Sequence, residues 1–181
     1  MAELKQGVRD IPSFAVTNVC TVLNLTPDIT VGAADNQRIG NKIFGRYFTV
    51  NIEFIFLKRD EWQSIAGYTL RMYIVWPRKL SYNDAITQAT STNFPVDGMP
   101  DQDNWIYWMD RKWTMSAGEI FGSPAAKNIK FYKRFPCLYE FSNSTAAIPT
   151  KCPLLIIASD YNPLIQTVQV VGYTKLSYKD I

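Results

Sequence analysis

The residues best suited to chemistry lie in residues 127–134, which read Lys-Asn-Ile-Lys-Phe-Tyr-Lys-Arg. Lysine and arginine side chains attract phosphate, and an aromatic ring can stack on an unpaired base. Alternate residues of a strand share a face, so an extended segment presents Lys130, Tyr132 and Arg134 together. We therefore predict a single-stranded nucleic-acid contact made by Lys127, Lys130, Tyr132, Lys133 and Arg134. The alternative is a solvated edge strand whose lysines discourage pairing with another sheet.

Four further cations are candidates for the same role. Lys5 and Arg9 lie in the polar first ten residues, where they either bind nucleic acid or simply keep a short arm soluble. Lys42 and Arg46 flank the start of a long predicted strand and rank below them. The net charge of the chain is only +3, whereas free nucleic-acid-binding domains carry a stronger positive stripe. This modest charge counts against a free nucleic-acid-binding domain.

Catalytic chemistry finds little support in the sequence. The chain has no histidine, so the commonest general base is missing and a Ser or Cys nucleophile lacks its usual partner. Neither a P-loop nor a GxGxxG motif occurs. Cys20, Cys137 and Cys152 are too widely separated for a metal site, and their odd number favours free thiols in a reducing compartment. We expect no catalytic residue, no cofactor and no enzyme activity.

Acidic residues were weighed as metal ligands. Asp97, Asp101 and Asp103 could ligate calcium through oxygen. Gly98 precedes Asp101 instead of following it, so the spacing departs from the EF-hand pattern. We therefore predict no metal site in the chain, and a metal ion bound by such carboxylates at a subunit contact stays open as a minor alternative.

Three tryptophans lie close together at positions 105, 108 and 113. Trp108 alternates with Ile106, so one face of this segment belongs to the core and Trp105 and Tyr107 point the other way. An outward Trp-Tyr pair is costly in water and suits contact with another subunit. We predict a subunit interface at Trp105 and Tyr107; the alternative is that a neighbouring loop covers them.

Period-two patterning predicts the elements that position these residues. In residues 47–56 every second side chain is apolar, which is typical of a strand with one buried face. Pro77 should end a second long strand, because proline cannot donate to a sheet. The remaining predictions are strands over residues 14–25, 68–76, 127–141 (broken at Pro136) and 167–178, a strand buried on both faces over 152–159, a hairpin over 104–116, and helical turns over 82–90.

These elements predict one all-β domain, a single eight-stranded jelly-roll β-sandwich with long loops. The chain of 181 residues suits one such domain, with a polar N-terminal arm over residues 1–13 and the sandwich over 14–181. Charged residues are only 19% of the chain, which suits either burial against partner subunits or a large β core. No apolar stretch approaches the ~18 residues of a transmembrane helix.

The residues of several segments, and the order of these segments, resemble the sequences of a known protein family. Several segments are similar to the jelly-roll capsid proteins of small circular single-stranded DNA viruses, the circovirus-like viruses. These segments are QRIGNKIF, LRMYIVW, the aromatic residues 103–115, the basic residues 127–135 and the closing strands 153–159 and 168–178. The similarity lies in the order of the segments over residues 14–181. Such capsid proteins usually begin with an arginine-rich arm, which residues 1–10 lack.

The resemblance implies a structural protein of the virion. Many copies would assemble into an icosahedral shell around single-stranded nucleic acid, by implication DNA, with a host receptor and no membrane among the expected partners. Satellite-virus coat proteins with RNA genomes share the jelly roll, so an RNA genome stays open. Two other classes also stay open: a lectin-like jelly-roll domain that binds a ligand and, ranked last, a cupin-like enzyme, which would need histidines that this chain lacks.

Overall fold

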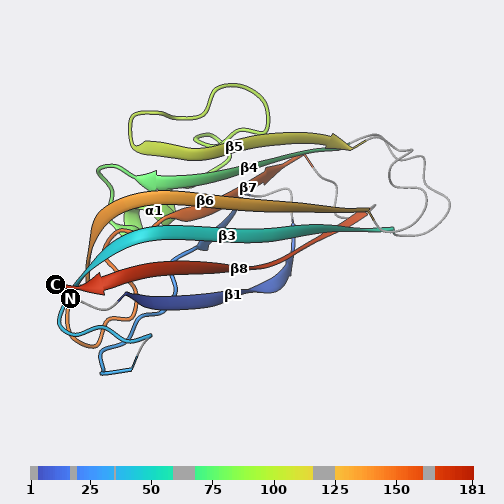
Figure 1. Ribbon diagram of the computed structural model, residues 1–181. Coiled ribbons are helices and arrows are strands. Elements are labelled where there is room, and N and C mark those ends of the chain that lie inside the picture. Colours follow the sequence, from blue (N-terminus) through green and yellow to red (C-terminus); the bar gives the residue numbers. More distant parts are fainter. Residues whose placement is uncertain (1–3, 17–19, 35, 59–67, 116–124, 161–165) are drawn as a thin grey trace.

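The computed structural model describes residues 4–16, 20–34, 36–58, 68–115, 125–160 and 166–181. Within them, two four-stranded antiparallel sheets lie face to face (Figure 1). Sheet A has the strand order β1 (Lys5–Ala15), β8 (Gln166–Asp180), β3 (Lys42–Lys58) and β6 (Ala125–Glu140). Sheet B has the order β2 (Thr21–Asn24), β7 (Leu154–Ser159), β4 (Tyr68–Pro77) and β5 (Trp105–Met115). Helix α1 (Tyr82–Gln88) lies in the connection from β4 to β5.

The strands pair as a set of nested antiparallel hairpins. β1 pairs with β8, β2 with β7, β3 with β6 and β4 with β5. Two further pairings, β3 with β8 and β4 with β7, join these hairpins into two sheets. This arrangement is the eight-stranded jelly roll, which confirms the predicted fold class. Among the described residues, no helix has the length and apolar character needed to cross a membrane.

The inner core forms between the two sheets, as the period-two pattern predicted. Phe48, Val50, Ile52 and Phe54 of β3 are all buried. They join Met72 of β4 in one cluster that spans both sheets. Removing this apolar surface from water supplies the main driving force for stacking the sheets.

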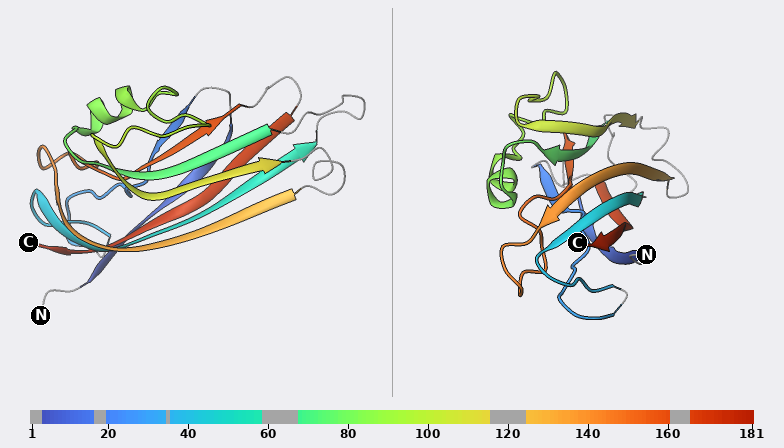
Figure 2. Two further views of the ribbon diagram at one scale, coloured as in Figure 1. Left: turned by 90° about the horizontal axis from the view of Figure 1, so that it is seen from above. Right: turned by 60° about the vertical axis from the view of Figure 1, so that its left-hand side comes forward.

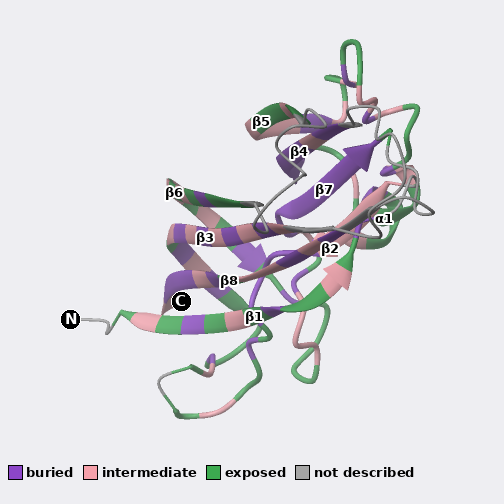
Figure 3. Ribbon diagram, turned by 90° about the vertical axis from the view of Figure 1, so that its right-hand side faces the viewer, coloured by how far each residue is buried: buried purple, intermediate pink, exposed green. Residues whose placement is uncertain are grey.

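A second core lies on the opposite side of sheet B. Tyr73 of β4 and Ile156 of β7 pack there with Ala85 of α1 and Phe94 of the β4–β5 connection. Figure 2 shows α1 and this connection lying over sheet B, and Figure 3 shows β7 buried along its length. β7 is buried on both faces, as predicted, because a core covers each of them. No comparable cluster of buried apolar residues covers the outward side of sheet A within the described chain.

Two predicted boundaries in this region are confirmed. β4 ends at Pro77, and α1 supplies the helical turns expected in residues 82–90. Ser81 caps the helix, since its hydroxyl accepts a hydrogen bond from the Asp84 backbone N–H at 3.3 Å.

Three other boundaries differ from the expectation. Most of the expected arm, residues 5–13, belongs to β1, because Ile11 reaches the inner core and the backbone pairs with β8. Residues 14–25 therefore hold the end of β1 and the separate strand β2. The hairpin expected over 104–116 is the single strand β5. β6 continues through Pro136, which is tolerated because β6 is an edge strand.

One buried charge joins two long connections at the end of the sandwich where β3 begins. The Arg38 side chain is 0% exposed. Its guanidinium donates to the carbonyl oxygens of Ile29 (3.3 Å), Asn143 (3.0 Å) and Ala146 (2.8 Å), and to that of Gly40. Its central carbon lies 4.0 Å from the centre of the Phe141 ring, within range of a cation–π contact. Residues 25–41 and 141–153 are thereby held together.

Replacing Arg38 should destabilise the fold strongly. Arg38→Met removes the donors of several buried carbonyls, so we expect the free energy of unfolding to fall by about 3 kcal/mol or more. The matched control Arg78→Met changes an exposed arginine and should alter it by less than about 0.5 kcal/mol. Urea unfolding followed by circular dichroism measures both, and equal effects would contradict the role given to Arg38.

Stability should also fall at alkaline pH. Burial raises the pKa of Tyr178 and of the Cys137 and Cys152 thiols, each to about 12. In an unfolded chain thiols ionise near pH ~8.5 and tyrosines near ~10. Between those values and 12 the unfolded chain releases protons that the folded chain keeps, so the free energy of unfolding decreases as pH rises.

The urea midpoint, measured at constant salt, should therefore drop steadily from about pH 9 upward. Tyr178→Phe should flatten this drop, because the hydroxyl that resists ionisation is gone. A midpoint that stays constant up to pH ~11 would show that these groups ionise freely in the folded chain.

Candidate nucleic-acid interface

The outward side of sheet A gathers cations and tyrosines from three neighbouring strands. In the register of β3 and β6 the outward pairs are Tyr47 with Arg134, Thr49 with Tyr132, and Asn51 with Lys130. β8 places Lys175 beside Thr49 and Lys179 beside Phe44. We call this surface the basic face and define it by Arg46, Tyr47, Lys130, Tyr132, Arg134, Lys175 and Lys179.

The predicted sharing of one face by Lys130, Tyr132 and Arg134 is confirmed. All three are exposed, whereas Ile129 is buried and the Phe131 ring packs 6.3 Å from that of Trp108. The alternation of an edge strand therefore turns the apolar residues of β6 inward and its polar residues outward. Their role toward nucleic acid remains a prediction.

Positive charge on the basic face is largely uncompensated. Among the described residues, none of its five cations forms an ion pair. On the outward side of sheet A, the acids of the described strands are Asp10 on β1, Glu53 on β3 and Glu140 on β6, and Glu140 pairs with Lys42 at 2.8 Å. A polyanion lying across β8, β3 and β6 would meet mainly cations.

The aromatic part of the basic face is a stacked pair of tyrosines. The Tyr47 and Tyr132 rings lie 5.8 Å apart between centres, with 21° between their planes. Tyr132 is 62% exposed, so part of its ring is available to another molecule. An exposed aromatic surface beside cations is the combination that single-stranded nucleic-acid-binding proteins use.

Lys5 and Arg9 do not belong to this surface. The Lys5 ammonium lies 2.8 Å from an Asp180 carboxylate oxygen and donates to the Gln37 carbonyl at 2.9 Å, which leaves its side chain 10% exposed. Arg9 lies on the inward side of β1, 3.7 Å from the Asp28 carboxylate. The structure gives Lys5 a structural role at the end of β1, apart from the basic face, and its contact with nucleic acid stays a prediction.

Lys127 and Lys133 also lie apart from the other cations of β6. In the register they stand opposite the buried Phe54 and Phe48 of β3, so both are on the inward side of the strand. Lys127 is exposed there and Lys133 is partly buried. Of the predicted nucleic-acid-binding residues, the structure therefore brings together Lys130, Tyr132 and Arg134.

Sequence reasoning missed several members of the basic face. No role was predicted for Tyr47, Lys175 or Lys179. Arg46 was ranked below other candidates. The outward alternation of β3 and β8 was visible in the sequence, but the register that sets these strands beside β6 was not.

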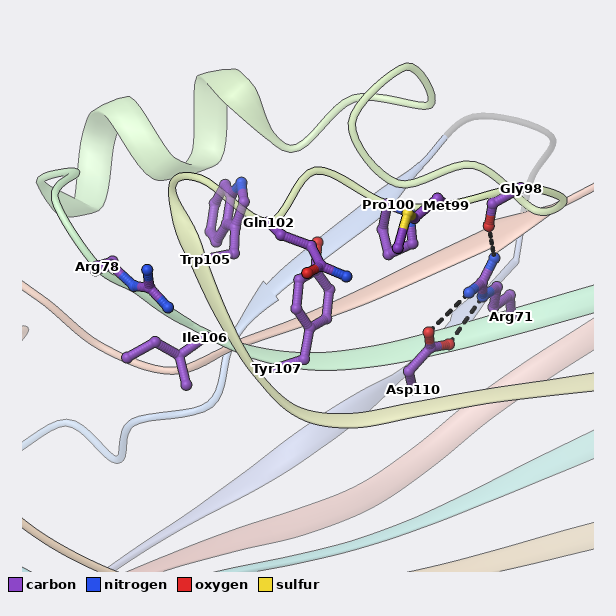
Figure 4. Close-up of a pocket in the computed structure, with 10 residues that line it drawn as sticks. All are labelled: Arg71, Arg78, Gly98, Met99, Pro100, Gln102, Trp105, Ile106, Tyr107 and Asp110. Atoms are coloured by element: carbon purple, nitrogen blue, oxygen red, sulfur yellow. Dashed lines mark hydrogen bonds and ion pairs between the residues drawn. The ribbon is translucent and has the colours of Figure 1, made fainter.

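Trp105 and Tyr107, the predicted subunit interface, lie in a groove under the β4–β5 connection (Figure 4). Trp105 is 1% exposed, and its ring lies 5.0 Å from that of Phe94 in an edge-to-face contact. The prediction that Trp105 anchors another subunit is therefore wrong, because the connection covers it. Tyr107 is partly buried, and its hydroxyl donates to the Asp101 carbonyl. Burial raises the pKa of the Tyr107 hydroxyl well above its usual value.

The groove has a volume of about 660 Å³, and one bidentate ion pair lies in its lining. Arg71 donates to both carboxylate oxygens of Asp110, at 2.8 and 2.7 Å, and to the Gly98 carbonyl at 2.7 Å. Figure 4 shows this pair at one end of the groove and Arg78 at the other, with Tyr107 between them. The pair ties β4 and β5 to the loop above them, which explains why Asp110 lies in the middle of a strand.

The acids weighed as calcium ligands have other partners. Asp97 pairs with Lys112, and the Asp101 carboxylate accepts a hydrogen bond from the Asp103 backbone N–H at 2.9 Å. Within the described part of the chain, no three His, Cys, Asp or Glu side chains lie close enough to hold a metal ion.

Trp105→Ala should act on stability and leave self-association unaffected. Removing a buried indole should lower the free energy of unfolding by about 3–5 kcal/mol. The neighbouring Met99→Ala, at a residue 80% exposed, should change it by less than about 0.5 kcal/mol. Urea unfolding compares the two, and a stable Trp105→Ala protein with altered particle size would restore the interface interpretation.

Comparison with family models and with curated protein sequences finds no match for this chain. Among solved structures, that of dimeric latent PorU from Porphyromonas gingivalis is similar over 99% of this chain and 13% of its own, at 11% sequence identity and a TM-score of 0.43. This chain thus spans a small fraction of that protein. A likeness at this level supports no inference about function.

Proposed function

We propose that this chain is a structural capsid protein. Many copies would self-assemble into a closed icosahedral shell around a small genome, which the resemblance of the sequence suggests to be circular single-stranded DNA. The jelly roll supports this proposal, since viral capsids are one of the main uses of that fold. A fold alone does not assign a function, so the proposal depends on the surfaces of the sandwich.

The observation that carries the proposal is the unequal covering of the two sheets. Sheet B is covered by α1 and the β4–β5 connection, which bury a second core. Sheet A keeps a bare outward side with five cations that lack ion pairs among the described residues. A shell subunit needs such a difference, because one side must meet the packaged nucleic acid and another must not.

Contacts between subunits would come from the edges and loops. Large side chains that are exposed in the single chain include Val8, Ile39, Met99 and Leu138. Their burial between copies would supply apolar driving force, and the low content of charged residues would limit the desolvation cost.

The groove beside Tyr107 is the observation that favours the lectin-like alternative. A cavity of about 660 Å³ that contains an aromatic ring, an arginine and an amide side chain has the size and polarity of a ligand site. A lectin-like domain would remain a monomer or a small oligomer in solution. Particle size therefore separates the two proposals.

Negative-stain electron microscopy of the purified protein is the direct test. We expect uniform round shells, with bound nucleic acid that DNase or RNase digests once the shells are opened. The nuclease that succeeds identifies the genome type. Small particles at every salt concentration and pH tried would contradict the capsid proposal and favour the lectin-like one.

The contribution of β6 to packaging can be measured in the same preparations. The double variant Lys130→Ala/Arg134→Ala should form shells with less co-purified nucleic acid, read as a lower ratio of absorbance at 260 to 280 nm. A matched control, Lys79→Ala/Lys151→Ala, removes the same charge from two loops outside the basic face. An equal drop in both variants would mean that net charge, and not the basic face, determines packaging.

A further inference from the structure

We propose that a hollow beside Tyr47 on the basic face is a binding site for one nucleotide unit of a single-stranded nucleic acid. Arg46 and Arg134 would hold its phosphate, and Tyr132 would stack on its base. The inference deepens the proposed function and rests on it, since it names how and where the packaged strand is held. Three observations carry it: the shape of the hollow, the charges in it and the stacked rings beside it.

The hollow is built by a shift in the register of sheet A. It has a volume of about 130 Å³ and is lined by Phe44, Arg46, Tyr47, Arg134 and Pro136. The pairing of β3 with both of its neighbours shifts between Gly45 and Tyr47, so Arg46 is left out of the regular ladder. Irregularities of this kind redirect a side chain and are common next to functional sites.

Alternation explains why this shift matters for Arg46. Gly45 faces inward, because a Cβ there would lie 2.4 Å from the Tyr139 ring, whereas Tyr47 faces outward beside Arg134. A regular strand would place these two residues on the same face. The shift removes that constraint and lets Arg46 stand with Tyr47 on the outward side, where it is exposed and lines the hollow.

The two arginines that line the hollow favour the binding of an anion. Within the described chain neither Arg46 nor Arg134 has an ion pair, although both line the same small depression. Two positive charges that line the same depression repel each other, and an anion bound there would be attracted to both. Phosphate suits the planar fork of arginine, which can donate two parallel hydrogen bonds to its oxygens.

The rings beside the hollow select a nucleotide over other phosphates. Tyr47 lines the hollow and stacks on Tyr132, which is the more exposed of the two. Tyr132 and Arg134 lie two residues apart on the same face of β6, about 6.6 Å along the strand. This separation lets one nucleotide place its phosphate at the arginines and its base on the tyrosine. Stacking on Tyr132 requires an unpaired base, so the site should prefer single strands to a duplex.

The experiment measures binding of a short fluorescein-labelled oligothymidylate to nucleic-acid-free protein by fluorescence anisotropy over a range of salt. Arg46→Ala should weaken binding at least about fivefold and should reduce the slope of log affinity against log salt by about 0.7, the value for one lost phosphate contact on a single strand. Tyr132→Leu should weaken binding at least about fivefold with little change in that slope. Arg46→Lys, which keeps the charge but loses the fork, should fall between Arg46→Ala and the unchanged protein.

Lys79→Ala is the matched control, because it removes one exposed positive charge from the loop after β4. A loss with Lys79→Ala equal to that with Arg46→Ala would overturn the site in favour of general attraction by charge. Binding of a duplex of the same length as tightly as the single strand, or binding of phosphatidylserine vesicles but not of the oligonucleotide, would overturn it as well.

Microscopy of the same variants separates this inference from the proposed function. Shells that form normally while Arg46→Ala binds the oligonucleotide like the unchanged protein would refute the site and leave the capsid proposal standing. Specific loss of binding in Arg46→Ala, in a protein that never forms shells, would refute the capsid proposal and support a nucleotide site on a free single-stranded nucleic-acid-binding protein.

Discussion

The buried guanidinium of Arg38 is the contact on which one whole end of the sandwich depends. The connections it joins, residues 25–41 and 141–153, contain backbone carbonyls that burial would leave without donors. One planar cation with five N–H groups can satisfy several of them at once. The first connection leads into β3 and the second leaves β6, so Arg38 also holds the ends of the two strands that form the hollow with Arg46 and Arg134.

The outward sides of the two sheets differ in character, although both sheets pack on the same inner core. The long β4–β5 connection packs on the outward side of sheet B. Arg71, which pairs with both carboxylate oxygens of Asp110, also donates to the Gly98 carbonyl of that connection. Aromatic residues that would be costly in water, such as Trp105, are thereby covered. Sheet A lacks such a cover among the described residues, and its outward side carries exposed lysines, arginines and tyrosines together with exposed apolar side chains such as Val8 and Leu138. The covering of one side therefore leaves the cations of the basic face concentrated on the other side.

Some of this architecture could be predicted from the sequence and some could not. β3 was predictable because strict alternation is typical of a half-buried strand, and β7 because its apolar run is short and contains β-branched isoleucines, which favours a strand over a helix. β1 was missed because it is an edge strand with Ile11 as its deeply buried apolar side chain, so its pattern is weak. Trp105 was misjudged because a pattern shows which face a residue takes but not whether a distant loop covers that face. The register of β3 and β6, which lie far apart in the chain, brings Arg46, Tyr47 and Arg134 together. That register cannot be predicted from composition.

The nested pairing of the strands has a consequence for how the chain is made. β4 and β5 are neighbours in both sequence and space, but β1 must wait for β8, which is synthesised after the other described strands. Contacts of such long sequence separation form slowly and late. Sheet A contains both β1 and β8, so it stays incomplete until residues 166–180 have been synthesised. A chain interrupted before that point would lack the strand that carries Lys175 and Lys179. Display of the complete cationic surface therefore requires synthesis of the chain through β8.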